Sequence, residues 1–149
     1  MIQGVDIVEI ARISRLSSHS RFCERVFTKR ELTLAERKHA KRRYELLAGR
    51  FAAKEAVIKA LGSLLVEPTP VEYAGLPQLT SEQVSSDESN HYPVGVSFHD
   101  IETLSHLSGA PILQLHGEAK RIAKSYHLSH FHVSLSHTND LAIAFAILS

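Results

Sequence analysis

An aspartate set among apolar residues is the feature that most limits how this chain can fold. Asp6 lies within Ile2–Glu9, an apolar run that predicts a buried first strand. A carboxylate inside such a strand costs on the order of several kcal/mol unless a cation or hydrogen-bond donors compensate it. A metal ion would meet this need most simply. The alternative is a carboxylate that only caps the helix that follows.

A long helical run in mid-chain carries a second carboxylate. Alanines recur along it every four residues, at positions 48, 52, 56 and 60, and would let another backbone approach closely. Gly49 in mid-helix predicts a further close contact. Glu55 could supply a second hard oxygen ligand, and Lys59, one turn later, could contact a phosphate and protonate a leaving group. The alternative for this pair is an i, i+4 ion pair on the surface.

Length and composition limit the classes of protein to which this chain can belong. A chain of 149 residues that is 44% hydrophobic fits one globular domain over residues 1–149. Cys23 is the only cysteine, which excludes an intramolecular disulfide and a cysteine-based zinc site. No apolar run approaches the roughly 20 residues of a membrane span, and no signal peptide is recognisable. We therefore expect a cytoplasmic protein without a membrane partner.

The basic residues are strongly concentrated in the first half of the chain. Of the 17 Lys and Arg residues, 14 lie between Arg12 and Lys59. This asymmetry favours an anionic partner, although the runs at 37–38 and 41–43 could also form a solvated helical face. A nucleic-acid-binding module would use residues 29–43, but it would lack interleaved aromatics and leave the two carboxylates unexplained. We expect no nucleic acid.

The N-terminal half predicts one strand followed by helices. A short helix is expected over Ile10–Leu16 and a second around Arg21–Arg25. Two capping boxes follow, Thr28 with Glu31 and Thr33 with Glu36, and a helix begins in one of them. This helix is expected to extend to Leu61, where Gly62 is placed to stop it.

The C-terminal half predicts strands. Residues 65–92 contain three prolines and a polar run, and they predict a long loop, part of it disordered. Strands and one helix follow, with a last strand that is expected to be central and covered on both faces: strand Val94–Leu104, strand Pro111–His116, helix Glu118–Tyr126, strand His130–His137 and strand Leu141–Leu148. This order indicates an α+β fold with an antiparallel sheet against the long helix.

Three segments, taken together, resemble a known family. They are GVDIVEIARI at 4–13, FAAKEAVIKALG at 51–62 and HVSLSHT at 132–138. Their order and rough spacing are similar to the three signatures of the holo-acyl-carrier-protein synthases, the small phosphopantetheinyl transferases. The resemblance covers nearly the whole chain outside the 65–92 loop. In the family a short glycine-containing segment follows the second signature, whereas here residues 63–68 lead into the long loop. Compared with the family, the loop is then either a cover over coenzyme A or a solvated insertion.

The resemblance implies an activity and an assembly. It implies Mg²⁺-dependent transfer of the 4'-phosphopantetheine arm of coenzyme A to a serine of acyl carrier protein, with release of adenosine 3',5'-bisphosphate. It also implies a homotrimer with active sites at subunit interfaces. A different class that would use the same metal site is a nucleotide pyrophosphate hydrolase, with water as the acceptor.

The resemblance also assigns roles to residues. Asp6 and Glu55 become the Mg²⁺ ligands, and Lys59 protonates or stabilises the leaving group. Either Glu55 or a metal-bound water takes the proton of the serine. The catalytic residues are thus Glu55, Lys59 and His137, and the expected coenzyme A contacts are Arg50, Lys54, Ile58, Lys59, Gly62 and His137.

The basic first helices acquire a partner from the same resemblance, because acyl carrier proteins are small and acidic. Phe22 is expected to serve as an apolar anchor. The docking surface, defined here as the anchor and the arginines around it, consists of Arg12, Arg15, Arg21, Phe22 and Arg25.

Overall fold

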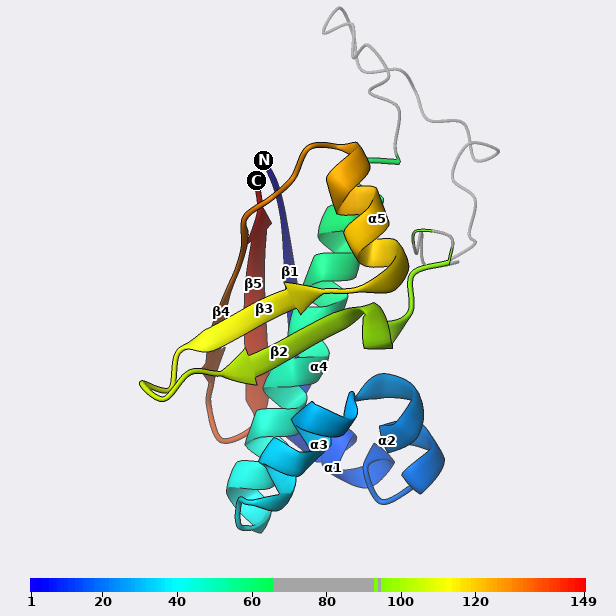
Figure 1. Cartoon of the computed structure of the whole chain (residues 1–149). Helices are drawn as coiled ribbons and strands as arrows, with labels where there is room; N and C mark the ends of the chain where they lie inside the picture. Colours follow the sequence, from blue (N-terminus) through cyan, green and yellow to red (C-terminus); the bar gives the residue numbers. More distant parts are fainter. Residues whose placement is uncertain (66–92, 94) are drawn as a thin grey trace, which may run out of the picture.

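A single long helix forms the centre of the molecule. The computed structural model describes residues 1–65, 93 and 95–149. Helix α4 (Ala40–Gly62) packs on one side against a three-stranded antiparallel sheet and on another against a two-stranded hairpin (Figure 1). The sheet has the order β1-β5-β4, with bounds Ile2–Glu9, Leu141–Leu148 and Phe131–His137, and the hairpin consists of β2 (Ile101–Ser105) and β3 (Pro111–Leu115). The expected α+β class is confirmed.

Short helices pack near the two ends of α4. Three of them gather near the N-terminal end of α4: α1 (Ile10–Leu16), α2 (Ser20–Val26) and α3 (Lys29–Glu36). Helix α5 (Gly117–Ser125) packs near the opposite end, where the two chain termini lie side by side (Figure 1). The termini meet because β1 and β5 pair antiparallel over their full length, from Ile2 opposite Leu148 to Glu9 opposite Leu141.

Alternation along the sheet separates a covered face from an open one. The three alanines of β5 at 142, 144 and 146 are fully buried against α4. The residues between them point the other way, and Ile143 and Phe145 remain 39% and 38% exposed. The position of β5 between its two neighbours is confirmed, but the expectation of cover on both faces is wrong for the single chain. The open face is apolar.

The backbones of β1 and α4 approach each other closely at Gly4. A Cβ at this position would clash with the carbonyl oxygen of Ala56 and lie 2.9 Å from the amide nitrogen of Ala60. The alanine row thus gives the predicted close backbone approach. Gly49 does not, because a Cβ there would meet only a Leu135 methyl at 3.9 Å, an ordinary contact. The prediction of a tight contact at Gly49 is wrong.

The helical segment before Gly62 is divided into two helices. Thr28 caps α3, since its hydroxyl accepts from the Glu31 amide at 3.3 Å and Glu31 accepts from the Thr28 amide at 2.9 Å. The second candidate box is not a cap, because the Thr33 hydroxyl bonds the Lys29 carbonyl inside α3. Helix α4 then starts at Ala40. It runs through Gly62, which is therefore not a left-handed stop.

The first predicted strand of the hairpin starts later than expected. Residues Phe98–Asp100 form a 3₁₀ turn, η1, instead of extended chain. The Ser97 hydroxyl accepts from the His99 amide at 3.1 Å, and the Asp100 carboxylate accepts from the Ser97 amide at 3.1 Å. These local side-chain bonds compete with strand pairing, so β2 begins only at Ile101.

We predict that Gly4→Ala lowers the free energy of unfolding by about 2–4 kcal/mol, since either β1 or α4 must shift. Gly49→Ala is the matched control, which should be neutral or stabilising by up to about 1 kcal/mol because alanine favours helix. Denaturant unfolding monitored by circular dichroism measures both. Equal stability of the two variants would contradict the close packing at Gly4.

Candidate functional site

Asp6 and Lys59 meet where β1 packs on α4. Asp6 lies two residues after Gly4, on the strand face that is directed at α4. Its Oδ1 lies 2.7 Å from the Nζ of Lys59, which also donates to the Val5 carbonyl at 3.3 Å. The Asp6 side chain is only 14% exposed, whereas that of Lys59 is 55% exposed. The predicted cost of burying Asp6 is therefore met, in this structure, by a lysine.

Glu55 belongs to the same group of charges. It is half-buried on α4, one turn before Lys59, so it lies on the same side of the helix. Two carboxylates from different elements, open to solvent on one side, form a donor set that suits Mg²⁺ with water and phosphate oxygens as its other ligands. Within the described residues no group of three or more His, Cys, Asp or Glu side chains could hold a metal. Asp6 and Glu55 therefore fit a cation that shares its coordination with a ligand, not an all-protein cage.

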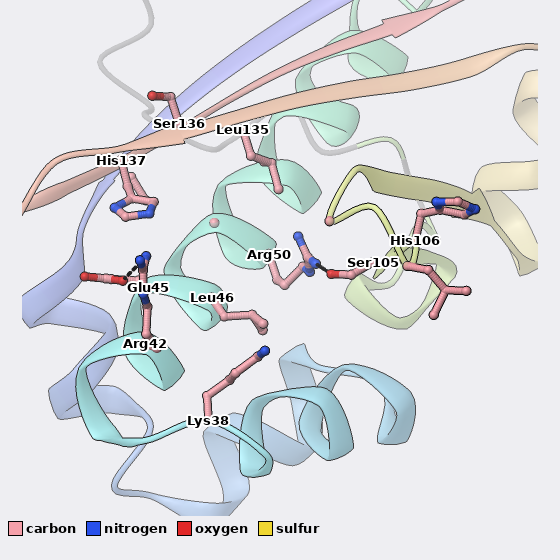
Figure 2. A pocket seen from close by; sticks show the side chains of 14 residues that line it. Lys38, Arg42, Glu45, Leu46, Arg50, Ser105, His106, Leu135, Ser136 and His137 are labelled. Atoms are coloured by element: carbon pink, nitrogen blue, oxygen red, sulfur yellow. Dashed lines mark hydrogen bonds and ion pairs between the residues drawn. The ribbon is translucent and has the colours of Figure 1, made fainter.

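A second group of polar residues surrounds a cavity of about 520 Å³ near the other end of α4. Figure 2 shows Lys38, Arg42 and Arg50 around this space, with His137 at the end of β4 above them. The Arg42 guanidinium forms an ion pair with Glu45 at 3.0 Å. Three cations outnumber one carboxylate here, so the cavity suits an anionic ligand. A neighbouring cavity also contains His137 and Arg42 and adds Lys41 and Thr138.

The two groups do not share a cavity within one chain. Neither Asp6, Glu55 nor Lys59 lines the cavity that contains Arg50 and His137. At 1.5 Å per residue, Arg50 and Lys59 are separated by about 13 Å along α4. The structure thus places the predicted metal ligands in one region and part of the predicted coenzyme A contacts in another.

Lys54 contradicts the expectation that it contacts coenzyme A. Its side chain is fully buried, with Nζ 2.9 Å from a Glu31 carboxylate oxygen and further bonds to the carbonyls of Phe98 (2.9 Å) and Ile101. Burial lowers the pKa of Lys54, and Glu31 opposes that shift. All the contacts of the ammonium are internal, so Lys54 connects α4 to α3 and β2 and does not face a ligand.

Two more predicted contacts lie in the core. Ile58 is 3% exposed and packs within the hydrophobic cluster, so its side chain is not presented to a ligand. Gly62 is buried in the last turn of α4, and its contact with coenzyme A stays a prediction. The notable 65–92 loop falls almost wholly outside the described residues.

Comparisons with known proteins agree on one family. The model of the 4'-phosphopantetheinyl transferase superfamily matches residues 3–92. The holo-[acyl-carrier-protein] synthase of Clostridium kluyveri is 38% identical over 146 residues, which cover 97% of this chain and 87% of the relative. The chain belongs to the 4'-phosphopantetheinyl transferase superfamily. The recognition of a holo-acyl-carrier-protein synthase-type enzyme is confirmed.

Solved structures of this superfamily show the same fold. A holo-acyl-carrier-protein synthase from Chronobacterium ammoniagenes in complex with coenzyme A has a TM-score of 0.70 and 31% identity, covering 99% of this chain and 96% of that one. The synthase from Bacillus anthracis, in complex with coenzyme A (3',5'-ADP), has a TM-score of 0.64 and 31% identity, covering 99% and 94%. The α+β fold of this superfamily member is thus confirmed by structure as well as by sequence.

The expected docking residues of this phosphopantetheinyl transferase lie on two short helices. Their arginines are exposed, on α1 at positions 12 and 15 and on α2 at 21 and 25. Phe22 is half-buried and stacks on Phe51, which stacks in turn on Phe98, with ring centroids 6.3 and 5.7 Å apart. All three rings line a broad cavity of about 1010 Å³. The role of Phe22 as an apolar anchor for a carrier protein stays a prediction.

Sequence reasoning missed three residues around the Arg50 cavity. Lys38 and Arg42 belong to the basic runs, where the sequence left a solvated face and an anion site as alternatives. Ser105, which accepts a hydrogen bond from Arg50 at 2.7 Å, carried no signal in the sequence.

Along the parts of the chain that the structure describes, no helix of this transferase has the length and hydrophobicity of a membrane span.

Proposed function

We propose that this enzyme transfers 4'-phosphopantetheine from coenzyme A to a serine of an apo acyl carrier protein and releases adenosine 3',5'-bisphosphate. The observation that carries the proposal is the Asp6–Lys59 contact at 2.7 Å with Glu55 one turn away. The named activity of the relatives and the coenzyme A in two related structures support it. A cytoplasmic location is part of the same proposal.

The group at the β1–α4 contact would carry the chemistry. Mg²⁺ held by Asp6 and Glu55 would neutralise charge on the pyrophosphate of coenzyme A. The serine oxygen attacks the phosphorus next to pantetheine, and the bond from that phosphorus to the bisphosphate oxygen breaks. Lys59 donates a proton to, or stabilises, the departing bisphosphate. Glu55 is the protein's own candidate to accept the serine proton.

The Arg50 cavity would bind the nucleotide end of coenzyme A. Adenosine 3',5'-bisphosphate carries phosphates at both ends of its ribose, and the cavity brings the cations of Lys38, Arg42 and Arg50 together. Guanidinium groups bind phosphate with paired hydrogen bonds, and His137 at the end of β4 adds a ring nitrogen to the rim.

A homotrimer would complete the site from two chains. The open face of the sheet presents Val5 and Ile7 of β1, 51% and 58% exposed, opposite Phe145 and Ile143 of β5. A contiguous apolar face of this kind marks a protein interface. Burying it against a second copy could bring the Arg50 cavity of one subunit to the Asp6 group of its neighbour, which would explain why the two groups lie apart within one chain.

The second candidate is a Mg²⁺-dependent nucleotide pyrophosphate hydrolase. It would use Asp6, Glu55 and Lys59 in the same way, with water in place of the serine. The exposed arginines of α1 and α2 favour the transferase, because a hydrolase needs no acidic protein partner.

One assay tests the proposed function. Incubation of the enzyme with coenzyme A, Mg²⁺ and an apo carrier protein should add the phosphopantetheine mass to the carrier, measured by mass spectrometry. Asp6→Ala and Glu55→Ala should each lower the rate about 100-fold or more, because the phosphate charge is no longer compensated. Glu36→Ala, an exposed carboxylate at the end of α3, is the matched control and should retain full activity.

The products distinguish the two candidate functions. Formation of adenosine 3',5'-bisphosphate together with an unmodified carrier would support the hydrolase. Equal activity with Mg²⁺ and with a chelator would contradict the metal role of Asp6 and Glu55.

A mixing experiment tests the shared site. Asp6→Ala and His137→Ala should each be weakly active alone, but trimers that contain both variants, formed by co-expression, should recover about one third of wild-type activity, because one of their three interfaces pairs two intact halves. Recovery is measured on the doubly tagged assembly. A monomer in solution, or no recovery in mixed assemblies, would contradict the proposal.

Charge reversal tests the docking surface. Arg12→Glu should raise the KM for the carrier protein about tenfold and leave the KM for coenzyme A unchanged, because Arg12 is exposed on α1 and outside both polar groups. Arg121→Glu on α5 makes the same change in net charge elsewhere on the surface. If both reversals raise the KM for carrier protein equally, the effect is one of general charge, and the predicted docking surface is wrong.

A further inference from the structure

Arg50 is a buried cation whose bonding in the structure is incomplete. The residue is only 5% exposed, and its Nη2 donates to the Ser105 hydroxyl at 2.7 Å. Its Nε is buried without a hydrogen-bond partner. Burial lowers the pKa of Arg50, and Glu31 opposes the shift. A buried guanidinium with an unsatisfied donor beside a cavity is a group prepared for an anion.

The buried carboxylate that acts on the charge of Arg50, Glu31, does not form an ion pair with it. Glu31 is already bound to Lys54 at 2.9 Å, and it accepts from the backbone amides of Thr28 and Thr103, each at 2.9 Å. Among the described residues, no carboxylate lies within ion-pair distance of Arg50. Its charge is therefore available to a ligand, while its orientation depends on the neutral hydroxyl of Ser105.

The fold fixes Ser105 at this place. Lys54, one turn after Arg50 on α4, holds the start of β2 through the Ile101 carbonyl. The Glu102 side chain, at the next position, accepts from the Thr28 hydroxyl at 2.6 Å and from Arg30 at 3.0 Å. The start of β2 is thus bonded to both α4 and α3, and Ser105 is the last residue of the strand.

We propose that Ser105 is a positioning residue that holds the Arg50 guanidinium toward the cavity of about 520 Å³, where Arg50 binds a phosphate of coenzyme A. Figure 2 shows the Ser105 hydroxyl against the guanidinium at the cavity wall. The inference rests on the proposed function. An arginine side chain has many rotamers when it is free, so a bond that restrains it before binding increases affinity.

The test uses the intact protein and calorimetric titration with coenzyme A. Ser105→Ala should raise the Kd about three- to tenfold, the loss that corresponds to the net contribution of one ordinary hydrogen bond. Ser105→Thr keeps the hydroxyl and should bind as the wild type does. Thr103→Val is the matched control, since it removes a β2 hydroxyl that has no partner and should leave the Kd unchanged.

A double-mutant cycle separates positioning from a general effect. Arg50→Met should weaken binding, and adding Ser105→Ala to it should cause no further loss, because Ser105 acts only through Arg50. In turnover, Ser105→Ala should raise the KM for coenzyme A and leave kcat and the KM for carrier protein unchanged.

Three results would overturn the inference. They are an unchanged Kd in Ser105→Ala, a loss of the same size in the Arg50→Met background, and an equal loss in Thr103→Val. Failure of the wild-type protein to bind coenzyme A would refute the proposed function itself. Binding by the wild type together with an unaltered Ser105→Ala would refute only the role of Ser105.

Discussion

The contact of Gly4 with α4 is the constraint on which the candidate site depends. With no side chain at Gly4, the backbone of β1 reaches the Ala56 carbonyl and the Ala60 amide. Asp6, two residues further on the same face, is then close enough for its carboxylate to meet Lys59 at 2.7 Å. A side chain at Gly4 would push the strand outward and separate the carboxylate of the strand from the charges of the helix. The small alanines of α4 allow this close approach, and with it the meeting of the two charges.

A second constraint, the ion pair of Lys54 with Glu31, fixes the other side of α4. A buried ion pair contributes little net stability, but it is strongly directional, and here it joins α3, α4 and β2 at one point. Lys54 and Arg50 are one turn apart, and both are buried cations. They differ in partners: Lys54 is bound by a carboxylate and two carbonyls, whereas Arg50 has one hydroxyl and an unpartnered Nε. This difference separates a structural cation from one available to a ligand.

Much of the fold can be predicted from local sequence patterns. The predictions that fail concern residues whose contacts come from distant parts of the chain. The strand over Ile2–Glu9 was predicted with its observed bounds, since alternation and helix signals lie within the segment itself. The role of Lys54 could not be predicted, because Glu31 and the Phe98 carbonyl come from remote segments that only the folded chain brings together. Ser105 escaped prediction for the same reason. Asp6 could be singled out from the sequence because a carboxylate in an apolar strand is anomalous even without a partner.

The candidate site and the proposed subunit interface both follow from the alternation of side-chain direction along β1. Side chains of successive residues point to opposite faces, so the register that directs Gly4, Asp6 and Val8 at α4 directs Val5 and Ile7 outward. A shift by one residue would bury the apolar pair and expose the carboxylate. A change of register that buried the apolar side chains of β1 would therefore also remove Asp6 from its contact with α4. This linkage explains why an exposed apolar face persists beside the polar site, and why association of chains would cover the face and complete the site in the same step.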